Sequence, residues 1–234
     1  MKELVLIIQS RWSLSQEIIS CMKDIAIYGA GGFGREMACA IQRLNSQETV
    51  WNFLGFFDDG IDKGAHNQYG EILGGIEELN RWNSPIAILI AIATSSIRKI
   101  ILEKIHNNLV DFPNFVLDFR CAYPNNYFLG KGNIILGTFF SCNVRIQDFN
   151  IFNGGAVLGH DDEIGSYNTF MPGTRISGEV HIGDENLFGV GSIVLQKIYI
   201  GNKVRVGAGS VLMRKTKDGK STKLLCIFSK IIFQ

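Results

Sequence analysis

The stretch from Ile146 to Leu212 reads IQDFNIFNGGAVLGHDDEIGSYNTFMPGTRISGEVHIGDENLFGVGSIVLQKIYIGNKVRVGAGSVL, and every sixth residue of it is apolar. These positions are Ile146, Phe152, Leu158, Ile164, Phe170, Ile176, Ile182, Phe188, Val194, Ile200, Val206 and Leu212. Because only 46% of the chain is hydrophobic, such a run is too regular to follow from composition. The period of six predicts a left-handed parallel β-helix over roughly Leu129 to Leu212.

Three six-residue repeats would form one triangular coil, so residues eighteen apart in sequence should stack. The predicted columns are Ile146/Ile164/Ile182/Ile200, Phe152/Phe170/Phe188/Val206 and Leu158/Ile176/Val194/Leu212. Matched side chains of this kind can fill a narrow prism without voids. Before Ile146, two registers are possible. Phe128, Ile134 and Phe140 continue the period of six unbroken, whereas a repeat that starts at Leu129-Gly130 requires a slip of one residue.

The preceding part of the chain alternates between strand-like and helix-like segments. We expect strands over residues 23–28, 51–59 and 86–93, and helices over 35–45, 75–82 and 95–106. In the last helix the apolar face is predicted to contain Ile97, Ile100, Ile101 and Ile105. This order indicates an α/β, Rossmann-like domain over 22–118, followed by the all-β helix domain over 119–219. Residues 1–21 are an extension that need not be native, and 220–234 form an atypical tail.

Composition excludes several classes of function. The formal net charge is +1 and no Lys/Arg block occurs, so nucleic acid is not an expected partner. The longest apolar runs are far shorter than the ~20 residues that span a bilayer, so membrane insertion is not expected. The five cysteines are scattered, with no metal-ligand spacing, which predicts free thiols, no metal and a cytoplasmic location.

A glycine-rich turn, Gly29-Ala30-Gly31-Gly32-Phe33-Gly34, separates the first predicted strand from the first helix. Backbone N–H groups in such a turn can face a diphosphate, although the motif alone equally fits a tight turn. Asp58 and Asp59 end the second strand, where a carboxylate can reach a ribose hydroxyl or simply be solvated. The spacing between the glycine-rich turn and these aspartates also fits an NAD site. However, a dinucleotide site needs two mononucleotide-binding halves of the protein, and only one precedes the repeats.

Four motifs, together with the repeats, resemble the bacterial sugar acyltransferases of the sialic-acid O-acetyltransferase type. They are YGAGGFGRE at 28–36, FFDD at 56–59, IAIA at 90–93 and GHD at 159–161, and the likeness covers about residues 22–219. The resemblance implies a sugar-nucleotide site in the Rossmann-like domain, acetyl-CoA as co-substrate on the β-helix, and a homotrimer. The chain departs from the family pattern at Ala93, where glycine is usual, and after Gly219, where the usual Gly-x-Pro-Ala-Lys loop is missing.

The resemblance assigns site residues to positions of this chain. The sugar nucleotide would contact Gly29, Gly31, Gly32, Phe33, Asp58, Asp59, Ala93 and Asn153, and acetyl-CoA would contact Val190, Gly207 and Ala208. His160 would be the general base, assisted by Asp161, because a thioester needs only a base for the acceptor proton. Composition alone would instead favour a surface histidine in a polar turn. Asn153 can equally be a turn asparagine.

Asp162 does not fit the repeat pattern. It shares a column with Val144, Val180 and Ile198. An unpaired carboxylate buried there would cost on the order of several kcal/mol of folding free energy. We therefore expect that this position faces water, or that Asp162 is paired or protonated.

The leading hypothesis is an acetyltransferase for surface glycans that acts on an amino or hydroxyl group of a sugar, which the resemblance implies is nucleotide-linked. The alternatives are a non-catalytic β-helical binding or assembly protein, including an inactive homologue with a disrupted C-terminus, and an NAD-dependent oxidoreductase. The sequence leaves the sugar, the acylated atom and the acyl group open.

Overall fold

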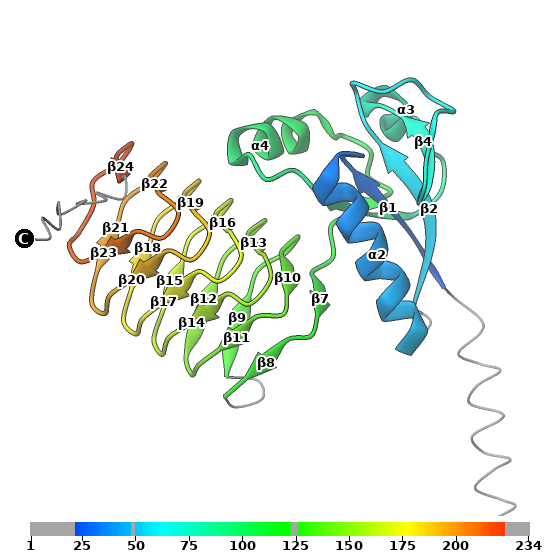
Figure 1. Cartoon of the computed structure of the whole chain (residues 1–234). Coiled ribbons are helices and arrows are strands. Elements are labelled where there is room, and N and C mark those ends of the chain that lie inside the picture. Colours follow the sequence, from blue (N-terminus) through cyan, green and yellow to red (C-terminus); the bar gives the residue numbers. More distant parts are fainter. Residues whose placement is uncertain (1–21, 48–49, 123–125, 223–234) are drawn as a thin grey trace, which may run out of the picture. The chain divides into compact units, whose positions relative to one another are not determined.

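A computed structural model describes residues 22–47, 50–122 and 126–222 of the chain. The chain divides into two compact units (Figure 1). Of the described residues, the first unit holds those up to Ile88 together with Asn107–Asp111, and the second holds Leu89–His106 and those from Phe112 onward. The expected extension 1–21 and all but residues 220–222 of the expected tail 220–234 lie outside the described residues, and the predicted domain boundary at 118/119 stays a prediction.

The first unit is built on a six-stranded sheet with the strand order β3-β4-β2-β1-β5-β6. Its strands are β1 (Lys23–Tyr28), β2 (Trp51–Phe57), β3 (His66–Asn67), β4 (Gly70–Gly74), β5 (Ile86–Ile90) and β6 (Val110–Asp111). The pairs β1–β2, β2–β4 and β5–β6 are parallel, as the alternation of strands and helices predicted. The antiparallel hairpin of β3 and β4 occupies a segment that we expected to be a loop.

The described part of this unit contains two helices, α2 (Gly32–Gln47) and α3 (Ile76–Asn80). As the apolar spacing predicted, α2 buries Met37, Ala40 and Ile41, whereas Leu44 is only half-buried. A Cβ at Gly34 would collide with the carbonyl oxygen of Gly29, so glycine is required where α2 starts against β1.

The helix α4 (Ser95–Lys104) lies in the second unit, and the predicted apolar face of this helix is confirmed at Ile101 but wrong at Ile97 and Ile100. Ile97 and Ile100 are exposed, whereas Arg98 and Ile101 are buried. The reason is that Arg98 finds acceptors for its guanidinium on the β-helix, and these hydrogen bonds turn its side of the helix inward. Apolar spacing could not reveal this, because the buried residue is a cation.

The rest of the second unit is a three-sided parallel β-helix (Figure 1). Its first side contains β7 (Phe115–Leu117), β10 (Ile134–Leu136), β13 (Ile151–Phe152), β16 (Thr169–Phe170), β19 (Leu187–Phe188), β22 (Arg205–Val206) and β24 (Ser221–Thr222). The second side contains β8 (Arg120–Cys121), β11 (Phe139–Phe140), β14 (Val157–Leu158), β17 (Arg175–Ile176), β20 (Ile193–Val194) and β23 (Val211–Leu212). The third contains β9 (Tyr127–Leu129), β12 (Val144–Ile146), β15 (Glu163–Ile164), β18 (His181–Ile182) and β21 (Tyr199–Ile200).

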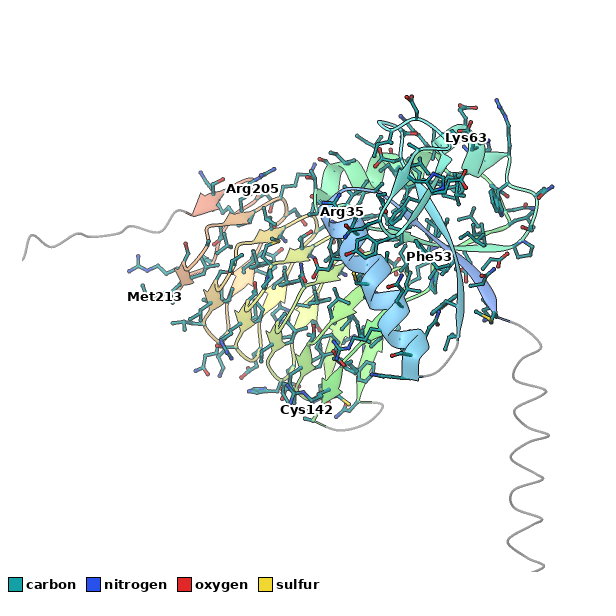
Figure 2. The ribbon with its side chains drawn as sticks, turned by 45° about the vertical axis from the view of Figure 1, so that its right-hand side comes forward. Arg35, Phe53, Lys63, Cys142, Arg205 and Met213 are labelled. Carbon is teal, nitrogen blue, oxygen red and sulfur yellow. The ribbon has the colours of Figure 1, made fainter. Side chains whose placement is uncertain are left out.

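The predicted inward columns are confirmed by strand register and burial. Phe152 pairs with Phe170, which pairs with Phe188, and all three are fully buried. Their rings stack face to face, with centroids 4.5 and 4.7 Å apart. Residues next to the inward positions point away from the coils, and Figure 2 shows Met213 doing so at the surface.

Upstream, the structure contains the one-residue slip. Leu129 pairs with Ile146 and Ile135 pairs with Phe152, whereas Phe140 keeps the register and pairs with Leu158. Phe128 therefore points outward and is 45% exposed. The step from Ile135 to Phe140 is five residues instead of six and contains Gly137, whose φ of 57° is left-handed, so this shortened corner absorbs the missing residue.

Three chemical features of the described residues bear on function. Cys39, Cys121 and Cys142 carry free thiols. No group of three or more His, Cys, Asp or Glu side chains that could hold a metal ion occurs in this part of the chain. Within the same ranges, no helix has the length and apolar character that crossing a membrane requires.

Candidate active site

The glycine-rich turn of the first unit lies between β1 and α2, as predicted. The Gly29 N–H donates to the carbonyl of Phe57 over 2.7 Å, which ties the turn to the end of β2. Gly31 and Gly32 are exposed, and a Cβ on either would meet open space. The side of the turn that carries these two glycines is therefore accessible, while Phe33 is half-buried.

Asp58 and Asp59 both contact this turn region. Asp58 accepts the Ala30 N–H over 2.9 Å, so one backbone donor of the turn is already used inside the protein. Asp59 accepts the Tyr28 hydroxyl over 2.7 Å and the Ile76 N–H of α3 over 2.8 Å. Burial, followed by the hydrogen bond to Asp59, raises the pKa of the Tyr28 hydroxyl above its usual range. Tyr28 was not singled out in the sequence because it ends an ordinary buried strand.

In the second unit, His160 and Asp161 lie at the corner that follows β14. The His160 Nδ1 and an oxygen of the Asp161 carboxylate are 2.8 Å apart. This hydrogen bond, the largest cause, raises the pKa of the His160 imidazole. If the Nδ1–H group donates this hydrogen bond to Asp161, the other ring nitrogen of the neutral imidazole, Nε2, carries no hydrogen and can accept a proton.

Two neighbours of this pair were not found by sequence reasoning. Asn143, one coil earlier, donates its side-chain N–H to the Asp161 carboxylate over 2.8 Å, and this contact is the main reason that the pKa of Asp161 is lowered. Gly178, one coil later, lies beneath the His160 ring, where a Cβ would collide with Nε2. Both residues are eighteen positions away from their partners, so the repeat itself is the signal that could have found them.

Asp162 is buried and paired. Its side chain has no exposed surface, and its two oxygens accept the N–H groups of Gly159 over 2.8 Å and of Val180 over 2.9 Å. Burial raises the pKa of this carboxyl to about 7. Of the arrangements expected for Asp162, exposure to water is therefore wrong, and pairing with backbone donors replaces it.

The residues assigned to acetyl-CoA lie at a different corner of the coil, after β19 and β22. The carbonyl of Val190 accepts the Gly209 N–H over 2.8 Å, which places Val190 beside Gly207 and Ala208 in adjacent coils. Val190 and Ala208 are exposed. Asn153, after β13, occupies this corner too, and its side chain accepts the Gly154 N–H over 2.8 Å, as a turn asparagine does.

Ala93 is exposed and belongs to the second unit. Its carbonyl accepts hydrogen bonds from Arg98 Nη1 over 2.9 Å and from the Thr169 hydroxyl over 2.8 Å. Arg98 also donates to the carbonyls of Ile92 and Tyr167, both over 2.7 Å. Burial lowers the pKa of this guanidinium to about 10. The segment after β5 is thus fastened to the β-helix within the second unit.

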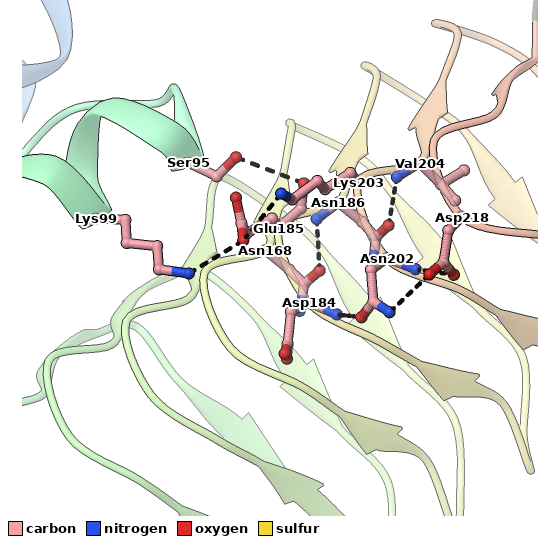
Figure 3. A network of polar contacts seen from close by, with 10 residues as sticks. All are labelled: Ser95, Lys99, Asn168, Asp184, Glu185, Asn186, Asn202, Lys203, Val204 and Asp218. Carbon is pink, nitrogen blue, oxygen red and sulfur yellow. Dashed lines mark hydrogen bonds and ion pairs between the residues drawn. The ribbon is translucent and has the colours of Figure 1, made fainter.

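Ionic and polar contacts add to this attachment (Figure 3). The Ser95 hydroxyl of α4 donates to the carbonyl of Glu185, and Lys99 Nζ lies 3.5 Å from the Glu185 carboxylate. Along the same side of the β-helix, Asn168 accepts the Asn186 N–H and Asn186 accepts the Val204 N–H. The side chain of each asparagine therefore joins its own coil to the next one.

Residues 24–105 match the family model of the PglD N-terminal domain. The acetyltransferase domain of PglB from Neisseria gonorrhoeae FA1090, solved with acetyl coenzyme A, has a TM-score of 0.77 and 26% identity, with 87% of this chain and 97% of that chain covered. WeeI from Acinetobacter baumannii AYE has a TM-score of 0.72 and 26% identity, with 85% and 95% covered. The matched domain and these structures support a bacterial sugar acyltransferase of the hexapeptide-repeat type.

A mutant of perosamine N-acetyltransferase from Caulobacter crescentus, solved with CoA and GDP-perosamine, shares the fold at a TM-score of 0.74 and 21% identity, with 87% of this chain and 94% of that chain covered. No curated protein sequence matches this chain. The predicted left-handed β-helix of the hexapeptide-repeat acyltransferases is thereby confirmed. For this acyltransferase, the structure brings together His160 with Asp161, and Val190 with Ala208, while the two pairs occupy different corners of the coil.

Proposed function

We propose that this acyltransferase transfers the acetyl group of acetyl-CoA to an amino or hydroxyl group of a sugar, with His160 as the general base. The observation that carries the proposal is the His160–Asp161 contact of 2.8 Å at a corner of the β-helix. The titles of the similar structures support it, since PglB was solved with acetyl coenzyme A, and perosamine N-acetyltransferase with CoA and GDP-perosamine.

In the proposed reaction, the acceptor nitrogen or oxygen attacks the thioester carbonyl carbon while its proton moves to His160 Nε2. The C–S bond then breaks, and the CoA thiolate leaves and takes that proton back from the imidazolium. Asp161 stabilises the imidazolium that exists between these two steps, and Asn143 holds Asp161. Because the thioester is already activated, no covalent intermediate on the protein is required.

We infer that the acceptor is a nucleotide-linked sugar of a surface-glycan pathway, held by the turn at Gly31 and Gly32. The open surface beside these glycines supports this, since backbone N–H groups there can meet a diphosphate. As part of the same proposal, the protein is a cytoplasmic homotrimer that binds acetyl-CoA at Val190, Gly207 and Ala208. Free thiols at Cys39, Cys121 and Cys142 fit a reducing compartment.

The test is thiol release from acetyl-CoA in the presence of UDP- and GDP-linked amino sugars, free amino sugars and sialic acids. The proposal expects release only with acceptors that carry a free amino or hydroxyl group, and greater release when the acceptor carries a nucleotide. Absence of acceptor-dependent release from the whole panel, together with absence of acetyl-CoA binding in titration calorimetry, would contradict it.

A further inference from the structure

The corner that carries His160 differs from the corresponding corners of the neighbouring coils in its backbone hydrogen bonds. After each strand of the second side, the next N–H normally donates to a main-chain carbonyl of the following coil. These bonds run from Ser141 to Leu158 over 3.0 Å, from Ser177 to Val194 over 2.9 Å and from Leu195 to Leu212 over 3.0 Å. Gly159 is the corresponding residue in the coil of His160, and it donates its N–H to the Asp162 carboxylate instead.

Asp162 therefore replaces a regular coil-to-coil bond with a bond inside its own corner. One of its oxygens accepts the Gly159 N–H, and the other accepts the Val180 N–H of the next coil. The short loop closed by the first bond contains only His160 and Asp161. Fixing this loop fixes the backbone from which the imidazole projects.

An asparagine would not make the same pair of bonds. Asn150 illustrates the ordinary arrangement, because its oxygen accepts the Asn168 N–H and its amide group donates to the carbonyl of Gln147, three residues earlier. At Asp162 the partner three residues earlier is the N–H of Gly159, which is a donor. Both partners of Asp162 are donors, so the side chain must accept at both positions, and a carboxylate does so.

The corner leaves little room for adjustment. A Cβ on Gly159 would collide with the backbone of Gly178, and a Cβ on Gly178 would collide with the His160 ring. The ring thus lies between its own turn and the next coil. A small movement of the Gly159 peptide would shift His160 Nε2, whose position decides how far the acceptor proton must travel.

We propose that Asp162 is a positioning residue of the His160 site, which holds the turn from Gly159 to Asp161 through two backbone hydrogen bonds. The proposal rests on the proposed function of His160 as the base. It assigns a purpose to a buried carboxylate in a column where the neighbouring coils carry Val144, Val180 and Ile198. It also predicts that the neutral side chain most similar in shape, asparagine, cannot replace it.

The test compares Asp162→Asn with a control, Asn133→Val. Asn133 is also fully buried, and it accepts the N–H of Asn150 in the next coil, but it does not contact the His160 corner. The Asp162→Asn protein is expected to lose at least ~10-fold in kcat, with KM for acetyl-CoA unchanged, because the base is misplaced. The control is expected to lower Tm and keep kcat within about two-fold, since distant sites act independently. If the kcat of Asp162→Asn stays within about two-fold of the wild-type value, the proposal is overturned.

A second readout does not depend on turnover. The imidazole resonances of His160 are followed by NMR from pH 5 to about 9, a range that covers histidine titration, with His66 and His106 as references. In Asp162→Asn the His160 titration midpoint is expected to move to lower pH and its chemical shift to change, because a carboxylate is lost and the turn moves. Unchanged shifts and midpoint overturn the positioning role, even if no acceptor is found and the proposed function fails.

The variant Asp162→Val covers the case in which Asp162→Asn does not fold. Valine occupies this column in both adjacent coils, at Val144 and Val180, so folding is expected. Loss of kcat with normal or raised Tm supports the positioning role, and normal kcat overturns it.

Discussion

At the scale of single residues, His160 and His181 make a natural comparison. Their side chains are 50% and 53% exposed, and the Nδ1 atom of each lies close to a carboxylate, 2.8 Å from Asp161 and 3.0 Å from Glu163. Only His160 has a carboxylate that is itself held, by Asn143, and a glycine beneath its ring. A histidine–carboxylate contact alone therefore does not distinguish the two histidines, whereas the residues around each contact do.

The effect of Asp161 on His160 predicts the pH dependence of turnover. A general base must be neutral, so the rate rises with pH through the pKa of His160, which Asp161 raises. In Asp161→Asn the ascending limb of the pH–rate profile is expected to move to lower pH, with a lower plateau because the ring orientation is no longer fixed. The profile is measured as kcat/KM against pH. A limb that stays in place would show that Asp161 does not act on the base.

Residue-level prediction from sequence succeeded where chemistry is local. His160 and Asp161 are adjacent in sequence, so their contact could be expected, whereas Asn143 and Gly178 reach them only through the coil repeat. The column of Asp162 could be predicted from the period of six, and its misfit was evident. The hydrogen bonds of Asp162 could not be predicted, because both partners are backbone N–H groups that no side-chain pattern reveals.

At the scale of elements, the attachment of α4 depends on a buried cation. Arg98 is 1% exposed and donates to carbonyls of its own loop and of the β-helix at Tyr167. Arg98→Met is expected to destabilise the protein by about 2 kcal/mol, because buried carbonyls lose their donors. Lys99→Met is the control, since the Lys99 side chain is 46% exposed and its contact with Glu185 is worth about 1 kcal/mol or less.

The measurement for this pair is urea unfolding, together with hydrogen exchange of the α4 amides. Faster exchange in α4 for Arg98→Met, but not for Lys99→Met, supports the account of how the helix is attached. Equal stability of the two variants would show that the hydrogen bonds of Arg98 do not hold the helix.

The phenylalanine stack makes a prediction for the β-helix itself. Phe170 is fully buried between Phe152 and Phe188. Phe170→Ala is expected to cost about 3–5 kcal/mol, since a cavity opens in a core one ring wide. Phe128→Ala is the matched control, because Phe128 points outward and its removal should cost about 0.5 kcal/mol or less. The free energy of unfolding from denaturant titration checks both, and equal losses would contradict the inward register.

The period of six predicted most of this element because one inward position per repeat suffices to set the register. It could not locate the shortened corner at Gly137, where the step from Ile135 to Phe140 is five residues instead of six and both remain buried. Nor could periodicity predict the buried side of α4, since Ile97 and Ile100 have the correct spacing and yet are exposed. In each case a specific backbone or polar contact outweighs the pattern.

At the scale of the whole molecule, each of the two units carries its own part of the chemistry. The first presents an open glycine turn whose neighbouring carboxylates, Asp58 and Asp59, hold backbone and hydroxyl donors. The second presents a histidine corner on a rigid ladder of coils. In the proposed function, the first unit holds the nucleotide-linked acceptor, and His160 of the second unit removes its proton.

The most direct measurement of that claim is the kcat of His160→Ala beside that of His181→Ala, with acetyl-CoA and the best acceptor of the panel. The account predicts a loss of at least ~100-fold for His160→Ala, with acetyl-CoA binding and Tm retained, and a kcat within about two-fold of wild type for His181→Ala. Near-normal turnover by His160→Ala, or equal losses in the two variants, would contradict the role of His160 as the base.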